Sequence, residues 1–236
     1  MKKWILAIII FLFPSVIVMF FLRLLGYKIG RKCRIGFSWV IVNELKMADY
    51  AKIGHLNFIY IPLLHMGQAS YIKKCNVIKG SICLNIELKG IVNQFNYMTS
   101  AFTHKNSICK IENNAILGVG HTLDLTSDIR LGAYSILAGK GSQVWTHGFY
   151  HSKKTHDRWR IDGKVEIGKN VYIGCRAIIC AGVHICDNCT IGAGVVVAKD
   201  IVKEGLYVNQ ALRYIEFDPD EAITKLHKVA EYIYEK

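Results

Sequence analysis

The stretch VEIGKNVYIGCRAIICAGVHICDNCTIGAGVVVAKD, residues 165–200, decides the fold. Aliphatic residues recur in it at every sixth position, and each is followed by a small residue. These aliphatic positions are Ile167, Ile173, Ile179, Ile185, Ile191 and Val197. A second series of small or apolar residues lies four places after the first, at Val171, Ala177, Val183, Cys189 and Val195. Because a six-residue period fits neither an α-helix nor a simple strand, we predict an all-β solenoid, a parallel β-helix.

Short strands account for this period. Each strand turns one aliphatic side chain inward, the chain bends at the small residue, and three strands complete a triangular coil of roughly eighteen residues. Coils stack at the usual strand separation of about 4.8 Å, so the inward columns fill the prism. The same spacing begins earlier in the chain, at Ile29, Ile35, Ile41, Met47, Ile53 and Ile59, and returns at Val119, Leu125, Leu131 and Leu137. Between residues 62 and 114 the frame is ragged, which predicts insertions at coil corners.

Composition points to an anionic partner. The 236 residues include 30 Lys and Arg against 18 Asp and Glu, a formal charge of +12, and 52% are hydrophobic. A membrane surface or a phosphate-bearing ligand fits this balance. The sequence has none of the motifs that bind nucleic acids, so nucleic acid is not an expected partner.

The first 25 residues predict a membrane anchor. No charge occurs from Trp4 to Leu22, but Pro14 and Ser15 divide this run into two apolar halves. Two interpretations remain open: one spanning helix, or a helix pair that enters the bilayer and returns. Basic residues on both sides of the run favour the pair. Both interpretations place the folded domain at the cytoplasmic face of the cell membrane.

Three parts of the chain follow from these patterns. Residues 1–25 form the anchor, residues 26–217 the β-helix, and residues 218–236 a C-terminal α-helix that covers the open end of the solenoid. The segment QVWTHGFYHSKKTHDRWRIDGK, residues 143–164, interrupts the repeat and is expected to be an extended, functional loop.

Neither cysteines nor histidines predict a metal site. Cys186 and Cys189 form a CxxC, but both fall at coil positions that require small residues, so we expect reduced thiols. His151 and His156 have the spacing of a zinc-binding pair in some β-helix enzymes. The third ligand, two coils earlier, would fall at Ala115, which cannot bind a metal.

The segments WTHG (145–148), VEIGKNVYIG (165–174) and VVVAKDI (195–201) resemble the hexapeptide-repeat O-acetyltransferases. This left-handed β-helix family includes galactoside, maltose and polysaccharide acetyltransferases. In the family a catalytic histidine precedes the IG pair of the last regular block, and His147, 21 residues before Gly168, is the match. An imidazole takes the proton of a sugar hydroxyl as its oxygen attacks the thioester of acetyl-CoA. Asp157 and Asp124 are the two candidates for an acid that orients this imidazole.

The resemblance also implies where the cofactor binds. Relatives are homotrimers that hold acetyl-CoA between neighbouring subunits along the last coils. The matching positions here are Gly174, Cys175, Ala193, Gly194, Ala198, Lys199 and Arg213. Relatives read GNPAR around the last of these, where this chain reads NQALR, so the turn there differs.

Exposed aromatic and basic residues of the loop are candidates for contacts with the acceptor sugar. These are Trp145, Tyr150, His151, Arg158 and Trp159. Closing a trimer interface is the alternative role for them. We predict a membrane-associated O-acetyltransferase that acts on a cell-envelope polysaccharide or a lipid-linked glycan precursor. Two alternatives stay open: an N-acetyltransferase that modifies an amino sugar or its nucleotide, and a non-catalytic membrane-bound scaffold.

Overall fold

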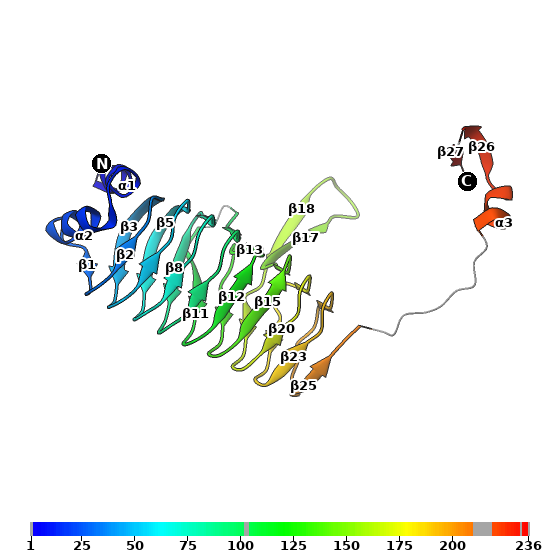
Figure 1. Cartoon of the computed structure of the whole chain (residues 1–236). Coiled ribbons are helices and arrows are strands. Elements are labelled where there is room, and N and C mark those ends of the chain that lie inside the picture. Colours follow the sequence, from blue (N-terminus) through cyan, green and yellow to red (C-terminus); the bar gives the residue numbers. More distant parts are fainter. Residues whose placement is uncertain (1, 102–103, 210–218, 232, 236) are drawn as a thin grey trace.

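A parallel β-helix forms the body of the molecule (Figure 1). The computed structural model describes residues 2–101, 104–209, 219–231 and 233–235. Strands stack on three faces of a prism. The first face contains the first halves of β3 (Trp39–Met47) and β5 (Phe58–Met66), then β7 (Val77–Lys79), β10 (Tyr97–Thr99), β13 (Thr122–Asp124), β16 (Gln143–Val144), β21 (Ile178–Ile179) and β24 (Val196–Val197).

The other two faces complete each coil. The second face contains β1 (Lys28–Ile29), the second halves of β3 and β5, β8 (Ile82–Ile86), β11 (Ser107–Ile111), β14 (Ile129–Leu131), β19 (Val165–Ile167) and β22 (His184–Ile185). The third face contains β2 (Arg34–Ile35), β4 (Lys52–Ile53), β6 (Tyr71–Ile72), β9 (Ile91–Val92), β12 (Ile116–Val119), β15 (Ile136–Lys140), β20 (Tyr172–Ile173), β23 (Cys189–Ile191) and β25 (Gly205–Tyr207). The predicted parallel solenoid is therefore confirmed.

Strand register gives the length of each coil. Tyr172 pairs with Thr190, 18 residues later, as the hexads of the regular block predict. In the ragged region Ile91 pairs with Ile116, so that coil holds 25 residues. Ile136 pairs with Tyr172, which leaves 36 residues in the coil that contains the predicted loop. The additional residues enter at corners and leave the stack of strands unbroken.

Inward side chains form the core that the hexads predict. All six aliphatic residues of the regular block and all five residues of its second series are buried. Two hexad positions differ from their expected role. Val119 is only half-buried, and Leu117 fills the core in its place. Ile41 is buried, but Val40 and Val42 on either side of it fill the interior, so Ile41 faces outward by the alternation of a strand. Helix α1 (Lys2–Leu12) packs on β3, the strand that contains Ile41.

A ladder of polar side chains runs along the corner between the third and first faces. Each rung accepts a hydrogen bond from the backbone N–H of the next: Ser38, Asn57, Asn76, Asn96, His121 and Ser142. The donor–acceptor distances are 2.9–3.1 Å. Since these amides are buried, the ladder satisfies groups that would otherwise be costly to desolvate. It also fixes how each coil sits on the next.

The N-terminal run forms two helices, α1 and α2 (Ser15–Leu24), separated at Pro14. The structure thus has two short helices here in place of one long helix. No helix among the described residues has the length and apolar character needed to span a membrane. Ser15 fixes the break to the solenoid, because its Oγ accepts a hydrogen bond from the backbone N–H of Ile35 at 3.0 Å. The inward sides of the helices cover the first coil through Leu6, Ala7, Ile10, Val18, Met19 and Leu22.

The C-terminal prediction is wrong for most of its length. The helix expected over residues 218–236 is limited to α3 (Pro219–Thr224), and β26 (His227–Ala230) pairs antiparallel with β27 (Ile233–Glu235). Ile223 and Val229, two of the apolar residues with which a covering helix would contact the open end, are exposed. The helical spacing of apolar residues was misleading, because the sequence HKVAEYIYE is rich in β-branched and aromatic residues that favour strands.

Candidate active site

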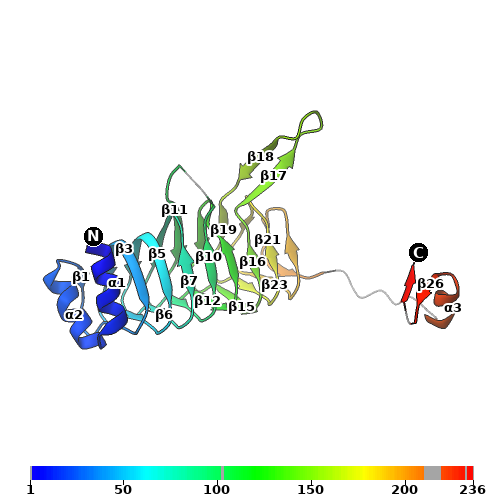
Figure 2. The same cartoon turned by 90° about the horizontal axis from the view of Figure 1, so that it is seen from above.

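The predicted extended loop is a β-hairpin that projects from the solenoid (Figures 1 and 2). Strands β17 (His147–His151) and β18 (Arg158–Asp162) pair antiparallel. The backbone N–H of Gly163 donates to the carbonyl of Thr146 at 2.8 Å and closes the base of the hairpin. The hairpin leaves the solenoid at the corner between the first and second faces, because β16 precedes it on the first face and β19 (Val165–Ile167) follows it on the second.

Asp124 and His147 meet at this base. Nδ1 of His147 lies 2.7 Å from Oδ2 of Asp124, although 23 residues separate them in the chain. The side chain of Asp124 is 6% exposed and that of His147 is 18% exposed. Asp124 ends β13, where the first face passes beneath the hairpin. The structure thus brings together the predicted base and one of the two predicted acids.

Two threonines surround the carboxylate of Asp124. Thr126 donates to Oδ1 from its hydroxyl at 2.6 Å and from its backbone N–H at 3.2 Å. The backbone N–H of Thr146 donates to Oδ2 at 2.9 Å, and its hydroxyl lies 3.0 Å from the same oxygen. Burial raises the pKa of Asp124, but the hydrogen bonds from Thr126, Thr146 and His147 outweigh burial and hold the pKa below its ordinary value. Asp124 is therefore an anion at neutral pH.

Asp157, the other candidate acid, lies elsewhere. It is in the turn of the hairpin, where its carboxylate accepts a hydrogen bond from the hydroxyl of Thr155 at 2.7 Å. His151 and His156 are exposed on the same hairpin. The structure therefore selects Asp124 as the neighbour of His147.

The dyad of Asp124 and His147 lies midway along one column of the first face. In the register of the strands, Trp145 follows Asp124, Cys180 follows Trp145, and Ala198 follows Cys180. At one strand separation per coil, Ala198 is about 14 Å from Asp124. The predicted cofactor residues therefore lie on the C-terminal side of the dyad.

The corner between the third and first faces holds four of the predicted cofactor residues. Gly194 donates its backbone N–H to the carbonyl of Cys175 at 2.8 Å, so the two coils are directly stacked there. A Cβ on Gly174 would lie 2.7 Å from the backbone nitrogen of Ala193, which leaves room only for glycine. Cys175, Ala193 and Gly194 are exposed, and the carbonyl of Gly194 accepts a hydrogen bond from Nδ2 of Asn209 at 2.9 Å.

The remaining cofactor candidates lie apart from this corner. Ala198 and Lys199 are exposed at the opposite edge of the first face, after β24. The short strands β21 and β24 separate the two edges. The predicted set thus borders both sides of the last coils of the first face. Arg213 lies outside the described residues.

The predicted acceptor contacts divide between the two sides of the hairpin. Tyr150 and Trp159 are cross-strand partners on one side, and His151 and Arg158 are partners on the other. His147 shares the side of His151, because alternate residues of a strand face the same way. Trp145 precedes the hairpin, and its Nε1 donates to Gln143 at 2.9 Å. All five side chains are exposed.

Sequence reasoning missed three residues at this site. Thr126 and Thr146 hold Asp124, and the ring of Phe149 meets that of His147 edge-on with centroids 5.6 Å apart. Thr126 stands two residues after Asp124, a spacing at which an aspartate often accepts a hydrogen bond from the backbone N–H. That local signal was present in the sequence, but nothing in it indicated which coil would pass beneath the hairpin.

The cysteines and histidines of the fold do not gather into a metal centre. Among the described residues, no group of three or more His, Cys, Asp or Glu side chains is placed to hold a metal ion. All eight cysteines are free thiols. The Sγ atoms of Cys186 and Cys189 lie 3.4 Å apart, with Cys189 buried in the coil.

Comparison with known proteins identifies the repeat. Residues 164–199 match the family model described as bacterial transferase hexapeptide (six repeats). This part of the chain is a run of such hexapeptide repeats. The predicted repeat is therefore confirmed where it is most regular. A search of curated protein sequences found no match.

Three solved structures illustrate the likeness in fold. AntD, an N-acyltransferase from Bacillus cereus in complex with dTDP and 3-hydroxybutyryl-CoA, is 15% identical, with 88% of this chain and 92% of that chain covered and a TM-score of 0.42. The polySia-specific acetyltransferase NeuO is 15% identical, with coverages of 74% and 91% and a TM-score of 0.36. A maltose O-acetyltransferase from Clostridium difficile 630 is 16% identical, with coverages of 92% and 86% and a TM-score of 0.31.

Proposed function

We propose that the protein transfers an acetyl group from acetyl-CoA to a hydroxyl group of a sugar, with His147 as the general base. The observation that carries this proposal is the contact between His147 Nδ1 and the buried carboxylate of Asp124 at 2.7 Å. A carboxylate in this position holds the proton on Nδ1 and leaves Nε2 to accept the proton of a hydroxyl. Asp124 acts as a positioning residue in this scheme.

The proposed chemistry is a direct transfer. As Nε2 of His147 removes the proton, the sugar oxygen attacks the carbonyl carbon of the thioester and forms the C–O bond of the new ester. The C–S bond then breaks, and the imidazolium returns its proton to the thiolate of coenzyme A. Because Asp124 remains an anion, it stabilises the imidazolium between these two steps.

Acetyl-CoA is proposed to lie along the last coils of the first face. The exposed residues Cys175, Ala193 and Gly194 would contact the pantetheine at this corner, where the buried Gly174 lets the coils stack closely. Lys199, and Arg213 by its resemblance to a basic family position, would face the phosphates. The thioester would then approach His147 from the C-terminal side, past Ala198.

A homotrimer is part of the proposal. The last coils expose apolar side chains, among them Val196, Val202, Leu206 and Val208. A second copy of the chain that covered these side chains would enclose the acetyl-CoA between two subunits and exclude water from the dyad.

Membrane association is supported by the outward side of the helix pair. Trp4, Ile8, Leu12, Val16 and Phe20 are exposed on it, and the side chain of Val16 is 82% exposed. The basic residues Arg31, Lys32 and Arg34 follow the pair and are suited to anionic lipid headgroups. A helix that is apolar on both sides lies between two apolar partners. The solenoid is one of them, and we propose one leaflet of the cell membrane, at its cytoplasmic face, as the other.

The chemistry is tested by coenzyme A release. The full-length protein is incubated with acetyl-CoA and p-nitrophenyl glycosides, and free thiol is measured with a chromogenic disulfide. The wild type should release thiol only when a hydroxyl acceptor is present, and the product should be an ester that dilute alkali hydrolyses. His147→Ala should reduce kcat by roughly 10²–10⁴-fold. A product that resists alkali would indicate an amide and an amino-sugar acceptor, and unchanged turnover in the variant would refute the assigned base.

Membrane association is tested by flotation with vesicles. The wild type should float with vesicles that contain anionic phosphatidylglycerol, and the double variant Val16→Glu, Phe20→Glu should remain in the dense fraction. Ile108→Glu, an exposed apolar position on the second face and away from both the helix pair and the last coils, is the control. Equal flotation of all three proteins would contradict the assigned surface.

A further inference from the structure

The first face has a distinct surface between the helix pair and the dyad. Its outward side chains form two columns that strand register fixes coil by coil. One column is Phe58, Val77, Tyr97 and Thr122, and the other is Tyr60, Lys79, Thr99 and Asp124. We call the exposed residues Phe58, Tyr60, Lys79 and Tyr97 the acceptor strip. It ends at Asp124, on the side of the dyad opposite to the proposed acetyl-CoA site.

The strip begins beside helix α1. The ring of Trp4 lies 6.0 Å from that of Tyr60, and the Nζ atom of Lys3 stands over the same Tyr60 ring at 5.5 Å from its centroid. A pocket of about 300 Å³ opens here, and its lining includes Lys3, Asn43, Gly80 and Ser81. An ammonium, an amide and a hydroxyl therefore border one concave site at the edge of the helix pair.

The chemistry of the strip combines flat rings with positive charge. Lys79 places its Nζ over the ring of Tyr97 at 5.7 Å, so a second ammonium follows that of Lys3 along the strip. The two columns contain no acidic residue before Asp124. Ammonium groups favour phosphate, and exposed aromatic rings pack against the apolar faces of sugars. A ligand that has both a phosphate and a glycan fits this arrangement.

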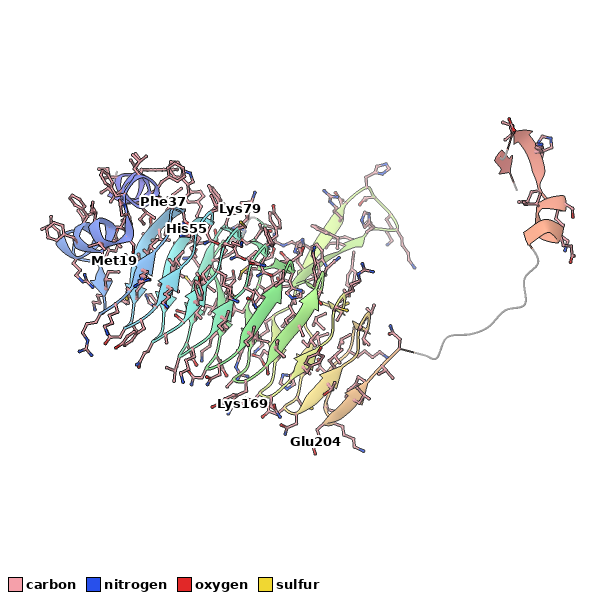
Figure 3. All side chains as sticks on the ribbon, viewed as in Figure 1. Met19, Phe37, His55, Lys79, Lys169 and Glu204 are labelled. Carbon is pink, nitrogen blue, oxygen red and sulfur yellow. The ribbon has the colours of Figure 1, made fainter. Side chains whose placement is uncertain are left out.

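We propose that the acceptor strip binds a glycan that is linked to a lipid through phosphate, with the phosphate in the pocket of Lys3 and Ser81 and the sugars along the rings toward His147. This inference rests on the proposed function and names its substrate class. Lys79 lies on the surface between the helix pair and the hairpin, as Figure 3 shows. The lipid tail would continue from the pocket onto the exposed apolar side of α1, where Trp4 and Ile8 lie.

The length of the strip restricts the acceptor further. Tyr60 and Asp124 are three strand positions apart in one column, so about 14 Å separates the start of the strip from the dyad. This distance is longer than one pyranose ring. The acceptor therefore has at least two sugars between its phosphate and the edge of the sugar that carries the reacting hydroxyl.

Two ligands test the inference by their binding to the full-length protein in detergent micelles. The first is farnesyl diphosphate, and the second is farnesyl diphosphate that carries N,N′-diacetylchitobiose. We expect saturable binding of both, with the glycan increasing affinity by about tenfold through ring contacts. The double variant Lys3→Gln, Ser81→Ala should weaken both ligands, whereas Tyr97→Ala should remove only the gain from the sugars. Lys52→Gln, an exposed lysine on the third face, is the matched control.

Several outcomes would overturn the inference. Farnesol that binds as tightly as farnesyl diphosphate would show that the pocket does not recognise phosphate. If the glycan adds no affinity, the strip does not bind the sugars of the acceptor. If the variants bind both ligands like the wild type, the substituted residues do not bind the acceptor. A lower subunit number for Tyr97→Ala in light scattering would show that the strip is an interface between copies of the chain.

The test separates this inference from the proposed transfer reaction. Asp124→Asn and His147→Ala should bind farnesyl diphosphate like the wild type, because neither residue lines the pocket. If the ligands bind the strip but the wild type releases no coenzyme A with any acceptor, the proposed function fails and the strip stands. If coenzyme A is released with soluble glycosides while neither ligand binds, the strip fails and the function stands.

Discussion

Asp124 divides the first face into an N-terminal and a C-terminal half, which have the same kind of inward side chains but different outward ones. On both sides of Asp124 the inward positions are aliphatic and buried, since every coil must fill the same prism. Outward, the N-terminal half presents Tyr60, Lys79 and Tyr97, whereas the C-terminal half presents Trp145 and then the small residues Cys180 and Ala198. A solenoid therefore leaves its surface positions free to vary coil by coil. One sheet can serve two ligands that approach a shared dyad from opposite ends.

The largest expected effect comes from the residue that separates the two halves. Asp124→Asn should reduce kcat by about 10²-fold or more, because an amide neither fixes the proton on Nδ1 of His147 nor stabilises the imidazolium. The same coenzyme A assay measures it, with circular dichroism to check folding. Asp157→Asn, on the turn of the hairpin, should retain wild-type activity. Equal losses in the two variants would show that the contact of 2.7 Å is not what matters.

A reciprocal pair of variants sharpens the comparison between the halves. Ala198→Trp should raise the KM for acetyl-CoA about tenfold, equivalent to about 1.4 kcal/mol of lost binding, and leave the KM for the acceptor unchanged. Tyr97→Ala should do the reverse with a phosphate-linked acceptor. Steady-state kinetics with each substrate varied in turn measure both KM values for each variant. If both variants raised the same KM, the two ligands would not occupy opposite ends of the face.

Coil stacking beside the cofactor half is tested at Gly139. This residue has a φ of +66°, and a Cβ there would lie 2.4 Å from Cβ of Cys175 in the next coil. Gly139→Ala should therefore lower the free energy of unfolding by about 2 kcal/mol. Gly148→Ala is the control, because a Cβ on Gly148 meets no atom within 4 Å. Urea unfolding followed by circular dichroism compares them, and equal stabilities would mean that the coils can separate at this corner.

Replacing His121 of the polar ladder is expected to have the smallest effect on stability at neutral pH. Burial lowers its pKa from 6.5 to about 4. Between these values the unfolded chain takes up a proton that the folded chain does not, so stability falls as the pH decreases through this window. His121→Asn extends the asparagine ladder and should lose less in melting temperature between pH 6.5 and pH 4. An equal fall in both proteins would mean that His121 does not titrate on unfolding.

The sequence was most informative where physical constraints repeat. Ile167, Ile173 and their successors occur at a period that only a coil of short strands can bury, so fold and core followed from the spacing alone. The candidate base His147 was implied by the resemblance to the hexapeptide-repeat O-acetyltransferases. The choice between Asp124 and Asp157 did not follow from the sequence, because it depends on how many residues each ragged coil contains. A local sequence pattern does not give the number of residues in a ragged coil, whereas the strand register of the structure does.

Short segments without a repeat were the least predictable. In the C-terminal region the helical spacing of Ile223 and Val229 competed with the strand preference of the residues around them, and the strands prevailed from His227 onward. The acceptor strip was also hidden in the sequence. Its residues lie about twenty positions apart, and each looks like an ordinary surface residue until strand register places them in adjacent columns.

The stacking of coils fixes the distance between the helix pair and the dyad of Asp124 and His147. Helix α1 is fixed to the first coil, and Asp124 lies on a later coil of the same rigid stack. The height of the dyad above the helix pair can therefore change only in steps of one coil, about 4.8 Å each. Inserting or deleting a whole coil between them would move the proposed base His147 by that step and leave its contact with Asp124 unchanged. A chain built in this way can match glycans of different length by the number of its repeats.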